Sequence, residues 1–289
     1  RCFDAWELEA TIDLKKEEIP CDGNIIKTKN ELGYFIHFTY NYNNSKIMQT
    51  LCLYNDKRRI DFKTVVDWKE SQKILKTAFS VDIRGVFARY DVQEGNIVRP
   101  ITRNTSWEAA KFEVVAHKWA DLSETGYGVA LLNDCKYGYD IKEDTMRLSL
   151  LKSATDPDYS ADYGTHEFTY SLYPHKEEWY NSGLEEEAFD LNSPVVVLDG
   201  ASALGNESLI SFDAKNIVLD AFKKAENEEA YVLRFHEFTG RRGKINLKTG
   251  LKFDSWCESD LMENPLGEWK QTATEVEVKP YEIKTIMLK

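Results

Sequence analysis

The feature that most restricts the fold of this 289-residue chain is a hydrophobic period of two. Apolar and polar side chains alternate over residues 6–14, 34–40, 60–68, 112–116 and 168–172. Such alternation is typical of a β-strand with one face in the core and one in water, because successive side chains point to opposite faces. Turn-forming residues separate these segments, at Asp22-Gly23, Asn43-Asn44, Asn55-Asp56, Glu94-Gly95-Asn96 and Gly126. The pattern therefore predicts an all-β sandwich.

The pattern changes near residues 192–205, where Asn192-Ser193-Pro194 precedes a short apolar run and Asp199-Gly200. Only residues 177–189 have a helical pattern, and Gly183 interrupts it. Beyond the change, short strands are predicted at 209–212, 217–222, 231–238, 244–247, 276–278 and 283–288. We therefore predict a larger β domain over residues 1–200 and a smaller β-sandwich over residues 201–289, which is within the usual size range of domains.

The chain carries 37 basic and 49 acidic residues, which gives a net charge of −12. This balance argues against binding to nucleic acid and to anionic membranes, which depends on lysine and arginine. No apolar segment approaches the roughly 20 residues that a membrane-spanning helix needs. The five cysteines include no Cys-x-x-Cys pair, so neither a redox pair nor a zinc ribbon is indicated. A domain of this size does not depend on disulfides, and we expect a reduced, cytoplasmic protein.

Residue patterns for catalysis or metal binding are sparse. The five histidines stand at positions 37, 117, 166, 175 and 236, and neither His-Glu pair continues as His-Glu-x-x-His. The carboxylates of Asp156, Asp158 and Asp162 are too close in sequence to be held, by themselves, on opposite sides of a glycosidic bond. Cys135 has no adjacent histidine to activate its thiol. We therefore predict no catalytic residue and no metal ligand, and we interpret the histidines as structural.

One polar loop, Asn133-Asp134-Cys135-Lys136-Tyr137-Gly138, follows an apolar strand that is predicted to be buried. Its asparagine, aspartate and lysine are good partners for sugar hydroxyls, and its tyrosine offers a stacking face and a hydroxyl. A β-turn explains the same residues, with Asn133 or Asp134 bonding its own backbone and Gly138 supplying a positive φ. The residue types alone favour the turn.

This loop belongs to a longer stretch with a family pattern. The stretch contains Asn104-Thr105-Ser106-Trp107, Phe112-Glu113-Val114, residues 116–124 and residues 126–138. It closely resembles the C-terminal β region of α-mannosidases of glycoside hydrolase family 38. Further matches stand at 3–6, 59–64, 66–68, 95–96, 99–100, 148–153, 157–158, 161–164, 166–170, 174–175, 234–237 and 258–263. The resemblance therefore covers nearly the whole chain.

The resemblance implies a fold for this chain and a location outside it for the catalytic and metal-binding residues. The family's large β domain resembles the supersandwich of galactose mutarotase, so we expect a mutarotase-like supersandwich followed by a smaller β-sandwich. Some strands of that domain precede the equivalent of Trp6 in family members. The aspartate nucleophile and the zinc, or another divalent metal, of the full enzyme lie in an N-terminal domain and a following helical region. This chain has no His-x-Asp pair of the kind that the metal centre uses. The fragment alone is therefore expected to hydrolyse no mannoside and to hold no tightly bound zinc.

The resemblance also assigns roles to two groups of residues. In the family, loops of the β region pack toward the catalytic domain and help to line the mannose-binding site. The resemblance therefore implies that the substrate rim includes Asn133, Asp134, Lys136 and Tyr137. An interdomain or loop-structural role is implied for Arg103, Asn104, Trp107, Asp158 and Asp162. Around Arg103 the structural role, with Trp107 buried, is favoured, and a histidine common in the family just before this position is absent.

Two hypotheses about function remain. In the first, the chain is the non-catalytic C-terminal portion of a retaining, metal-dependent α-mannosidase. Its partners are then the N-terminal catalytic domain of the same polypeptide and a mannose-containing oligosaccharide. In the second, the chain is an independent carbohydrate-binding or mutarotase-like β module. Fold does not separate them, since one architecture hosts many functions, but the matches at residues 116–124 and 131–138 favour the first.

Overall fold

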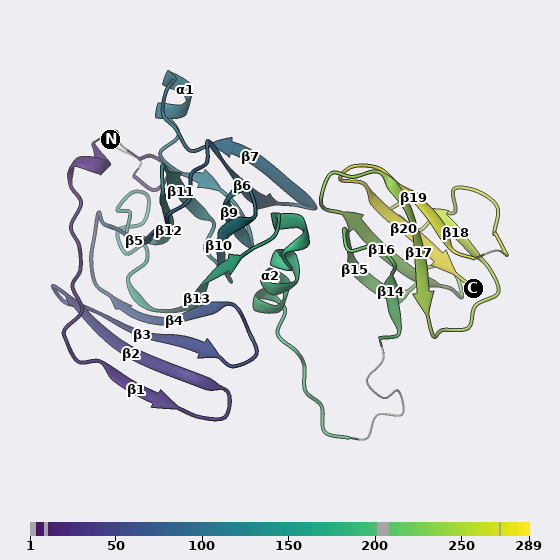
Figure 1. Ribbon diagram of the computed structural model, residues 1–289, viewed down its shortest axis with the longest axis horizontal. Coiled ribbons are helices and arrows are strands. Elements are labelled where there is room, and N and C mark those ends of the chain that lie inside the picture. Colours follow the sequence, from purple (N-terminus) through teal and green to yellow (C-terminus); the bar gives the residue numbers. More distant parts are fainter. Residues whose placement is uncertain (1–3, 9–10, 201–207, 272) are drawn as a thin grey trace. The chain divides into compact units, whose positions relative to one another are not determined.

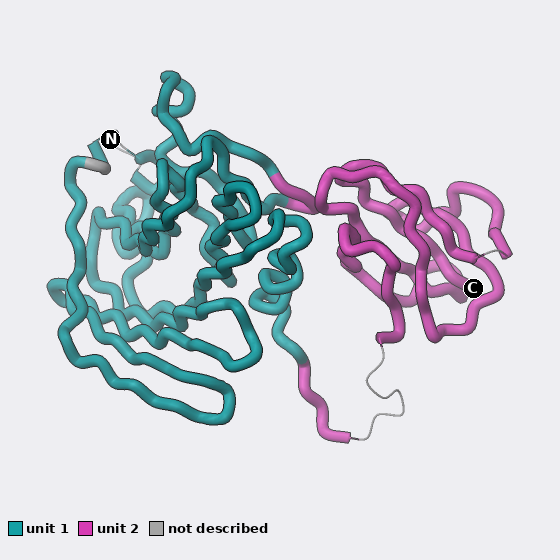
Figure 2. Tube along the Cα trace, in the orientation of Figure 1, with its two compact units in different colours: residues 1–92, 97–195 teal, residues 93–96, 196–289 magenta. Residues whose placement is uncertain are grey.

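A computed structural model describes residues 4–8, 11–200, 208–271 and 273–289 (Figure 1). Strands make up 49% of the chain and helices 7%, which confirms the predicted β fold. The chain divides into two compact units (Figure 2). The first contains Arg1–Val92 and Ile97–Val195, and the second contains Gln93–Asn96 and Val196–Lys289. Among the described residues, no helix is long and apolar enough to cross a membrane.

Two β-sheets form the first unit. The larger sheet has nine strands, in the spatial order β1 (Ile26–Lys29), β2 (Gly33–Tyr42), β3 (Ser45–Tyr54), β4 (Ile60–Trp68), β13 (Gly164–His175), β10 (Tyr127–Asn133), β9 (Trp119–Glu124), β6 (Phe87–Val92) and β7 (Gly95–Pro100). The smaller sheet has four strands, in the order β5 (Ile74–Ser80), β12 (Thr145–Lys152), β11 (Gly138–Lys142) and β8 (Val114–Val115). All four residues of the edge strand β1 are exposed.

The two sheets share one hydrophobic core. Trp68 of β4 and Leu131 of β10 contribute to it from the larger sheet, and Leu148 of β12 from the smaller one. On β13 the expected alternation is present, since Phe168 and Tyr170 are both buried. Strands bury alternate residues because successive side chains point to opposite faces. The strands predicted from the alternation at 34–40, 60–68 and 168–172 are thus confirmed.

Two of the alternating segments do not form the full strands that were predicted. The strand predicted over residues 6–14 is wrong, because residues 4–6 form a turn and Ile12–Leu14 form a 3₁₀ helix, η1. Trp6 and Leu14 are 69% and 82% exposed, and the segment lies in none of the described sheets. The strand predicted at 112–116 is reduced to β8. Alternation yields a strand only where a neighbouring edge satisfies the backbone hydrogen bonds, and sequence does not show that edge.

Helices are few and short in the first unit. The helix α1 (Ser106–Ala109) is a single turn, whereas α2 (Leu184–Asn192) follows the short 3₁₀ helix η2 (Trp179–Asn181) and lies against β10. The helical pattern predicted at 177–189 is therefore confirmed in part. Gly183 is the N-cap of α2 with a φ of 83°, a left-handed conformation that glycine adopts without a steric cost. The glycine that interrupts the pattern thus marks the beginning of the helix.

The second unit is a small β-sandwich. One sheet contains β14 (Ile210–Phe212), β17 (Gly243–Thr249) and β19 (Glu275–Val278), and the other contains β15 (Ile217–Lys224), β16 (Tyr231–Glu237), β20 (Ile283–Leu288) and β18 (Trp256–Ser259). Phe235, Trp256 and Ile286 lie at the centre of its core. All the strands predicted after residue 208 are present. The strand β18 was not predicted, because its residues, Trp-Cys-Glu-Ser, do not alternate between apolar and polar as those of the equally short β14 and β19 do.

Candidate active-site rim

The loop at residues 133–138 connects β10 of the larger sheet to β11 of the smaller one. Asn133 ends β10 and is 1% exposed. Its side-chain Nδ2 donates to the backbone oxygen of His117 at 2.7 Å and to the hydroxyl of Tyr139 at 2.6 Å. Its Oδ1 accepts a hydrogen bond from the backbone N–H of Lys136 at 2.5 Å. Asn133 therefore stabilises the turn from within.

Asp134 joins the loop to the neighbouring strand β13. Its backbone N–H donates to the carbonyl oxygen of Thr169 at 3.1 Å, and its Oδ2 accepts from the N–H of Thr169 at 2.8 Å. The other carboxylate oxygen, Oδ1, is buried and has no hydrogen-bond partner among the described residues. These contacts extend the pairing between β10 and β13 by one residue, so Asp134 also limits the movement of the loop.

The side-chain polar groups of Lys136 and Tyr137, unlike those of Asn133 and Asp134, make no hydrogen bond within the described chain. The Nζ of Lys136 is 4.6 Å from the centre of the Phe168 ring and makes no hydrogen bond or ion pair with any described residue. Tyr137 is 54% exposed, and its ring meets the ring of His117 edge to face at 5.7 Å. Its hydroxyl has no polar partner in the described chain. The loop therefore presents an ammonium that contacts only an aromatic ring, and a phenolic hydroxyl without a polar partner in the described chain.

Cys135, between these residues, is not an activated nucleophile. Partial burial of its sulfur and the neighbouring carboxylate of Asp134 raise the pKa of Cys135 to about 11. The thiol is therefore protonated at neutral pH, whereas the thiolate is the reactive form.

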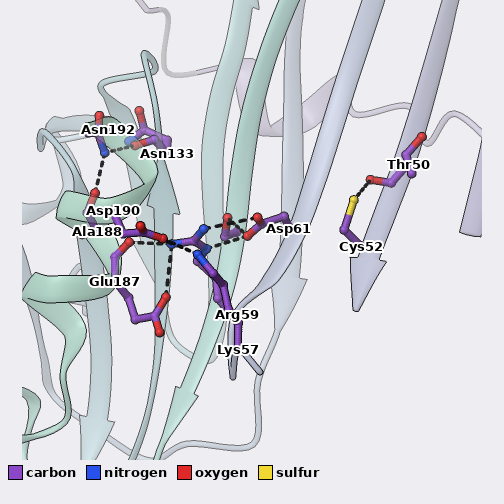
Figure 3. Close-up of polar contacts among 11 residues, drawn as sticks. Thr50, Cys52, Lys57, Arg59, Asp61, Asn133, Glu187, Ala188, Asp190 and Asn192 are labelled. Carbon is purple, nitrogen blue, oxygen red and sulfur yellow. Dashed lines mark hydrogen bonds and ion pairs between the residues drawn. The ribbon is translucent and has the colours of Figure 1, made fainter. Parts of the chain in front are cut away.

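The helix α2 supports the loop at the end of β10. Asn192, the last residue of α2, donates from Nδ2 to the backbone oxygen of Asn133 at 2.9 Å and to that of Ala188 at 2.9 Å (Figure 3). The side chain thus closes the C-terminal turn of the helix and fixes the last residue of β10 at the same time. The position of the loop depends in this way on the position of α2.

A buried arginine fastens α2 to the sheet (Figure 3). The Nε of Arg59 donates to Asp61 Oδ1 at 2.7 Å, and its Nη1 donates to the backbone oxygen of Glu187 at 2.6 Å and to Glu187 Oε2 at 3.1 Å. Asp190 lies 3.4 Å from the same Nη1 and also pairs with Lys57. Burial disfavours the charged guanidinium, but the hydrogen bond and the charge of Asp61 outweigh it and raise the pKa of Arg59. This network could not be predicted from sequence, because its members come from residues 57–61, around the beginning of β4, and from α2.

Arg103 lies beside a small cavity at the base of α1. Its Nη2 is 3.7 Å from Asp140 Oδ1, and its guanidinium is 5.7 Å from the centre of the Phe112 ring. Tyr90 and Arg99 also line this cavity, which has a volume of about 30 Å³. That volume holds roughly two water molecules and is too small for a hexose ring.

The prediction that Trp107 is buried is wrong, because this side chain is 64% exposed. The helix α1 is closed by a capping box in which Glu108 N–H donates to Thr105 Oγ1 and Thr105 N–H donates to Glu108 Oε2. Asn104 adds a third bond from its own N–H to Glu108 Oε2 at 2.7 Å. Because these polar bonds hold the turn, α1 buries none of its side chains and projects from the sheets (Figure 1).

Asp158 and Asp162 lie in a different loop, between β12 and β13. Asp158 Oδ1 accepts from both the N–H and the hydroxyl of Ser160 at 2.8 Å, and the backbone bond lowers the pKa of Asp158. Asp162 has a φ of 60°, and its Oδ2 accepts from the N–H of Lys152 at 2.6 Å. In the described chain no hydrogen bond or ion pair joins these carboxylates to residues 133–138.

Four of the five histidines make contacts of a structural kind. His37 bonds Thr28 and Thr50, His166 bonds the backbone oxygen of Asp162, His117 packs on Tyr137, and His175 bonds Asp121. Only His236 lies with two carboxylates, those of Glu94 and Asp220. Sequence analysis predicts no such group, because its members stand far apart in the chain.

His175 makes stability depend on pH. Its Nε2 lies 2.9 Å from Asp121 Oδ1 and its Nδ1 lies 2.7 Å from the oxygen of Glu177, in a fully buried position. Burial disfavours the imidazolium, but the hydrogen bond and charge of Asp121 outweigh it and raise the pKa of His175. The stabilisation is complete below the unfolded pKa of about 6.5 and is lost as pH rises through the folded pKa.

We therefore expect the free energy of unfolding to fall as pH rises above about 6.5, and His175→Gln to remove this part of the slope. Urea unfolding of both proteins at a series of pH values measures the difference. Parallel pH profiles for the two proteins would contradict the assignment.

Comparison with known proteins connects this arrangement to a family. Residues 1–160 match the profile described as glycosyl hydrolases family 38 C-terminal domain. Residues 216–286 match the profile described as glycosyl hydrolases family 38 C-terminal beta sandwich domain. The chain belongs to glycoside hydrolase family 38. It comprises the C-terminal β domains of that family, as the resemblance predicts.

Individual relatives support the assignment. The chain is 37% identical to alpha-mannosidase G of Dictyostelium discoideum over 84% of its own length and 23% of the relative. It is 36% identical to human alpha-mannosidase 2C1 over 91% of its length and 26% of the relative. The chain thus spans about a quarter of these curated relatives. The crystal structure of an alpha-mannosidase from Enterococcus faecalis V583 shares the fold, with a TM-score of 0.79 and 14% identity over 94% of this chain and 35% of that chain.

Proposed function

We propose that this chain is the non-catalytic C-terminal portion of an α-mannosidase, and that its loop at 133–138 forms part of the rim around terminal α-linked mannose. One observation carries the proposal. Asn133, Asp134 and Asn192 brace the loop, whereas the ammonium of Lys136 and the hydroxyl of Tyr137 have no polar partner in the described chain. Polar groups that are held in place without an internal partner suit the binding of an external ligand. The names of the relatives supply the substrate class.

Hydrolysis itself is proposed to occur in an N-terminal domain of the same polypeptide. The chain spans only 23% and 26% of the two relatives named alpha-mannosidase. Retaining hydrolysis needs two carboxyl groups about 5 Å apart on either side of the glycosidic bond. A divalent metal of the family kind needs a His-x-Asp pair, which the sequence lacks, and the one group of possible metal ligands in the described chain contains a single histidine. The residues present do not fit that metal centre, so no chemical step is assigned to this chain.

The proposed contribution of the chain is to bind and orient the sugar. Lys136 has up to three N–H donors for sugar hydroxyls, and Tyr137 both donates and accepts through its hydroxyl. The exposed ring of Tyr137 adds an apolar face against which a sugar stacks. Membership of the family over both domains favours this role over an independent carbohydrate-binding module.

Kinetics and melting on the same variants of the full-length parent enzyme test the rim. Tyr137→Phe removes one hydroxyl without an internal partner, so kcat/KM should fall by about 2- to 12-fold, which corresponds to one neutral hydrogen bond. Lys136→Met removes charged hydrogen bonds and should lower kcat/KM by about 12- to 150-fold. The melting temperature should change little in both variants, because neither polar group has a hydrogen-bond partner within the described chain.

Two further variants serve as controls for the rim. Tyr34→Phe removes an exposed hydroxyl on β2, outside the loop, and should leave kcat/KM unchanged. Asn133→Ala removes three hydrogen bonds that stabilise the turn and should lower the melting temperature. Normal kinetics for both Tyr137→Phe and Lys136→Met would show that the loop is a structural turn only.

We also propose a cytoplasmic location for the parent protein. The four cysteines in the described chain, at positions 21, 52, 135 and 257, are free thiols. Free thiols are typical of proteins in reducing compartments, where disulfides do not persist. Fractionation of cells that express the parent protein tests this proposal, and recovery from a secretory compartment contradicts it.

A further inference from the structure

Three side chains of the second unit, Glu94, Asp220 and His236, form the one group in the described chain with the composition and spacing of metal ligands. One ligand atom from each lies within 4.8 Å of the other two. The Nδ1 of His236 is 2.8 Å from Glu94 Oε2 and 2.9 Å from Asp220 Oδ1. We propose that these three side chains bind one divalent cation of the zinc type, with water completing the coordination.

The backbone directs each ligand to this point. On β15, Leu219 pairs with Phe235 and Ala221 pairs with Arg234, so Asp220 is the extra residue of a β-bulge. A bulge re-aims the side chain that it carries, and here that side chain lies against His236 of the neighbouring strand β16.

Glu94 lies in the turn between β6 and β7, and the segment Gln93–Asn96 belongs to the second unit. Asn96, at the beginning of β7, donates from Nδ2 to the backbone oxygen of Phe238 at 2.6 Å. Glu94 itself has a φ of 53°, an uncommon conformation for a residue with a long side chain. The turn is therefore fixed with its carboxylate next to the imidazole.

The charges of the three side chains favour the binding of a cation. A neutral imidazole carries a single N–H, so Nδ1 cannot donate a full hydrogen bond to Glu94 and to Asp220. No lysine or arginine of the described chain pairs with either carboxylate. Two carboxylates at close range repel each other and disfavour their joint ionisation. A divalent cation between the three groups converts this repulsion into attraction and satisfies every ligand atom.

The donor set favours zinc over calcium or magnesium. Zn²⁺ accepts imidazole nitrogen and carboxylate oxygen at about 2.0–2.2 Å, and three protein ligands plus water make a common tetrahedral site. Neighbouring ligand atoms of such a site are roughly 3.3–3.6 Å apart. The separations of 2.8 and 2.9 Å from Nδ1 therefore need an outward shift of about half an ångström, which the partly exposed Glu94 and Asp220 can supply. Calcium and magnesium prefer all-oxygen sites.

The side-chain exposures also suit a site that loads from solution. The side chain of His236 is only 6% exposed, so its position is fixed by the surrounding sandwich. Those of Asp220 and Glu94 are 25% and 43% exposed, which leaves room for an entering ion and for water. The proposal replaces the expectation from sequence that the chain contains no metal ligand.

The test uses the whole chain, stripped of metal with a chelator and titrated calorimetrically with Zn²⁺ near neutral pH. One Zn²⁺ should bind per chain. Glu94→Gln and His236→Gln should each lower the affinity by at least about 10-fold, the loss that removal of even an outer-shell partner causes. Calcium and magnesium should bind at least about 10-fold more weakly than zinc. Glu94 is partly exposed, so its variant keeps the test decisive even where His236→Gln fails to fold.

Two matched controls exclude binding to scattered surface groups. Glu268→Gln removes an exposed carboxylate of the same unit that has no partner among the described residues, and His37→Gln removes a histidine that bonds two threonines. Both should leave the affinity for zinc unchanged. Absence of saturable binding, or binding that the Glu94 and His236 variants retain in full, would overturn the proposal. Equal affinity for calcium would overturn the zinc assignment.

Discussion

Replacement of Gly128 by alanine should lower the free energy of unfolding by about 3–5 kcal/mol. Gly128 lies on β10 directly opposite His175 of β13. A Cβ atom at this position would stand 2.3 Å from Ser123 Oγ and 2.4 Å from His175 Cε1. The imidazole has no room to withdraw, because it is fully buried and bonded to Asp121 and to a backbone oxygen. The new methyl group therefore breaks a buried ion pair and overpacks the sheet at the same time.

Thermal melting and urea unfolding of the whole chain measure this effect. A loss of that size corresponds to a fall in melting temperature of roughly 10 °C for a domain of this length. Gly85→Ala is the matched control within the first unit, since its new Cβ would come no nearer than 3.4 Å to another atom. Equal losses in the two variants would show that the contact with His175 does not set the cost.

Arg59→Met should destabilise the first unit by about 3–5 kcal/mol, which is the usual cost of leaving one member of a buried ion pair alone. Asp61 is 3% exposed and would lose its only cationic partner in the described chain. The same substitution removes the ion pair with Glu187 and one of the two cationic partners of Asp190, and it loosens α2 from the sheet. Asn192 at the end of α2 holds the backbone of the loop at 133–138. Under the proposed role of that loop at the substrate rim, kcat/KM of the full-length parent should fall as well.

A double variant separates the ion pair from simple loss of packing. Arg59→Met combined with Asp61→Asn removes the isolated charge and should recover at least about 1 kcal/mol relative to Arg59→Met alone. Lys57→Met is the control, because Lys57 is 32% exposed and its pair with Asp190 should contribute less than about 1 kcal/mol. No recovery in the double variant would indicate that Arg59 stabilises the unit through packing of its hydrocarbon stem.

The sequence predicted those strands whose alternation coincides with a buried face. On β13 both the pattern and the burial are present, whereas the equally regular pattern at residues 6–14 gives a turn and a 3₁₀ helix. The difference lies in whether another strand offers an edge, and that is a property of the tertiary structure. Conversely, β18 is a strand because β20 pairs with it, although its four residues show no clear period.

The loop at 133–138 shows which features of a candidate binding site can be predicted from residue types and which cannot. Sequence alone left a turn and a sugar contact as alternatives. The structure shows the hydrogen bonds of a turn, whereas the sugar contact stays a prediction. Asn133 bonds its own loop, as a turn requires, while Lys136 and Tyr137 keep their polar groups unused in the described chain. The supports of the loop, Arg59 and Asn192, could not be predicted, because they reach it from elements distant in sequence.

In the part of the chain that the structure describes, no further strand pairs with the two outermost strands of the nine-stranded sheet, so both carry backbone groups that another chain could pair with. The outer strand β1 is exposed at all four residues, and two of these are Lys27 and Lys29. The opposite outer strand, β7, ends with Arg99 and Pro100, and proline has no N–H to offer. Charge and proline at a sheet edge disfavour edge-to-edge association between molecules. The sheet therefore resists growth into aggregates without having to close into a barrel.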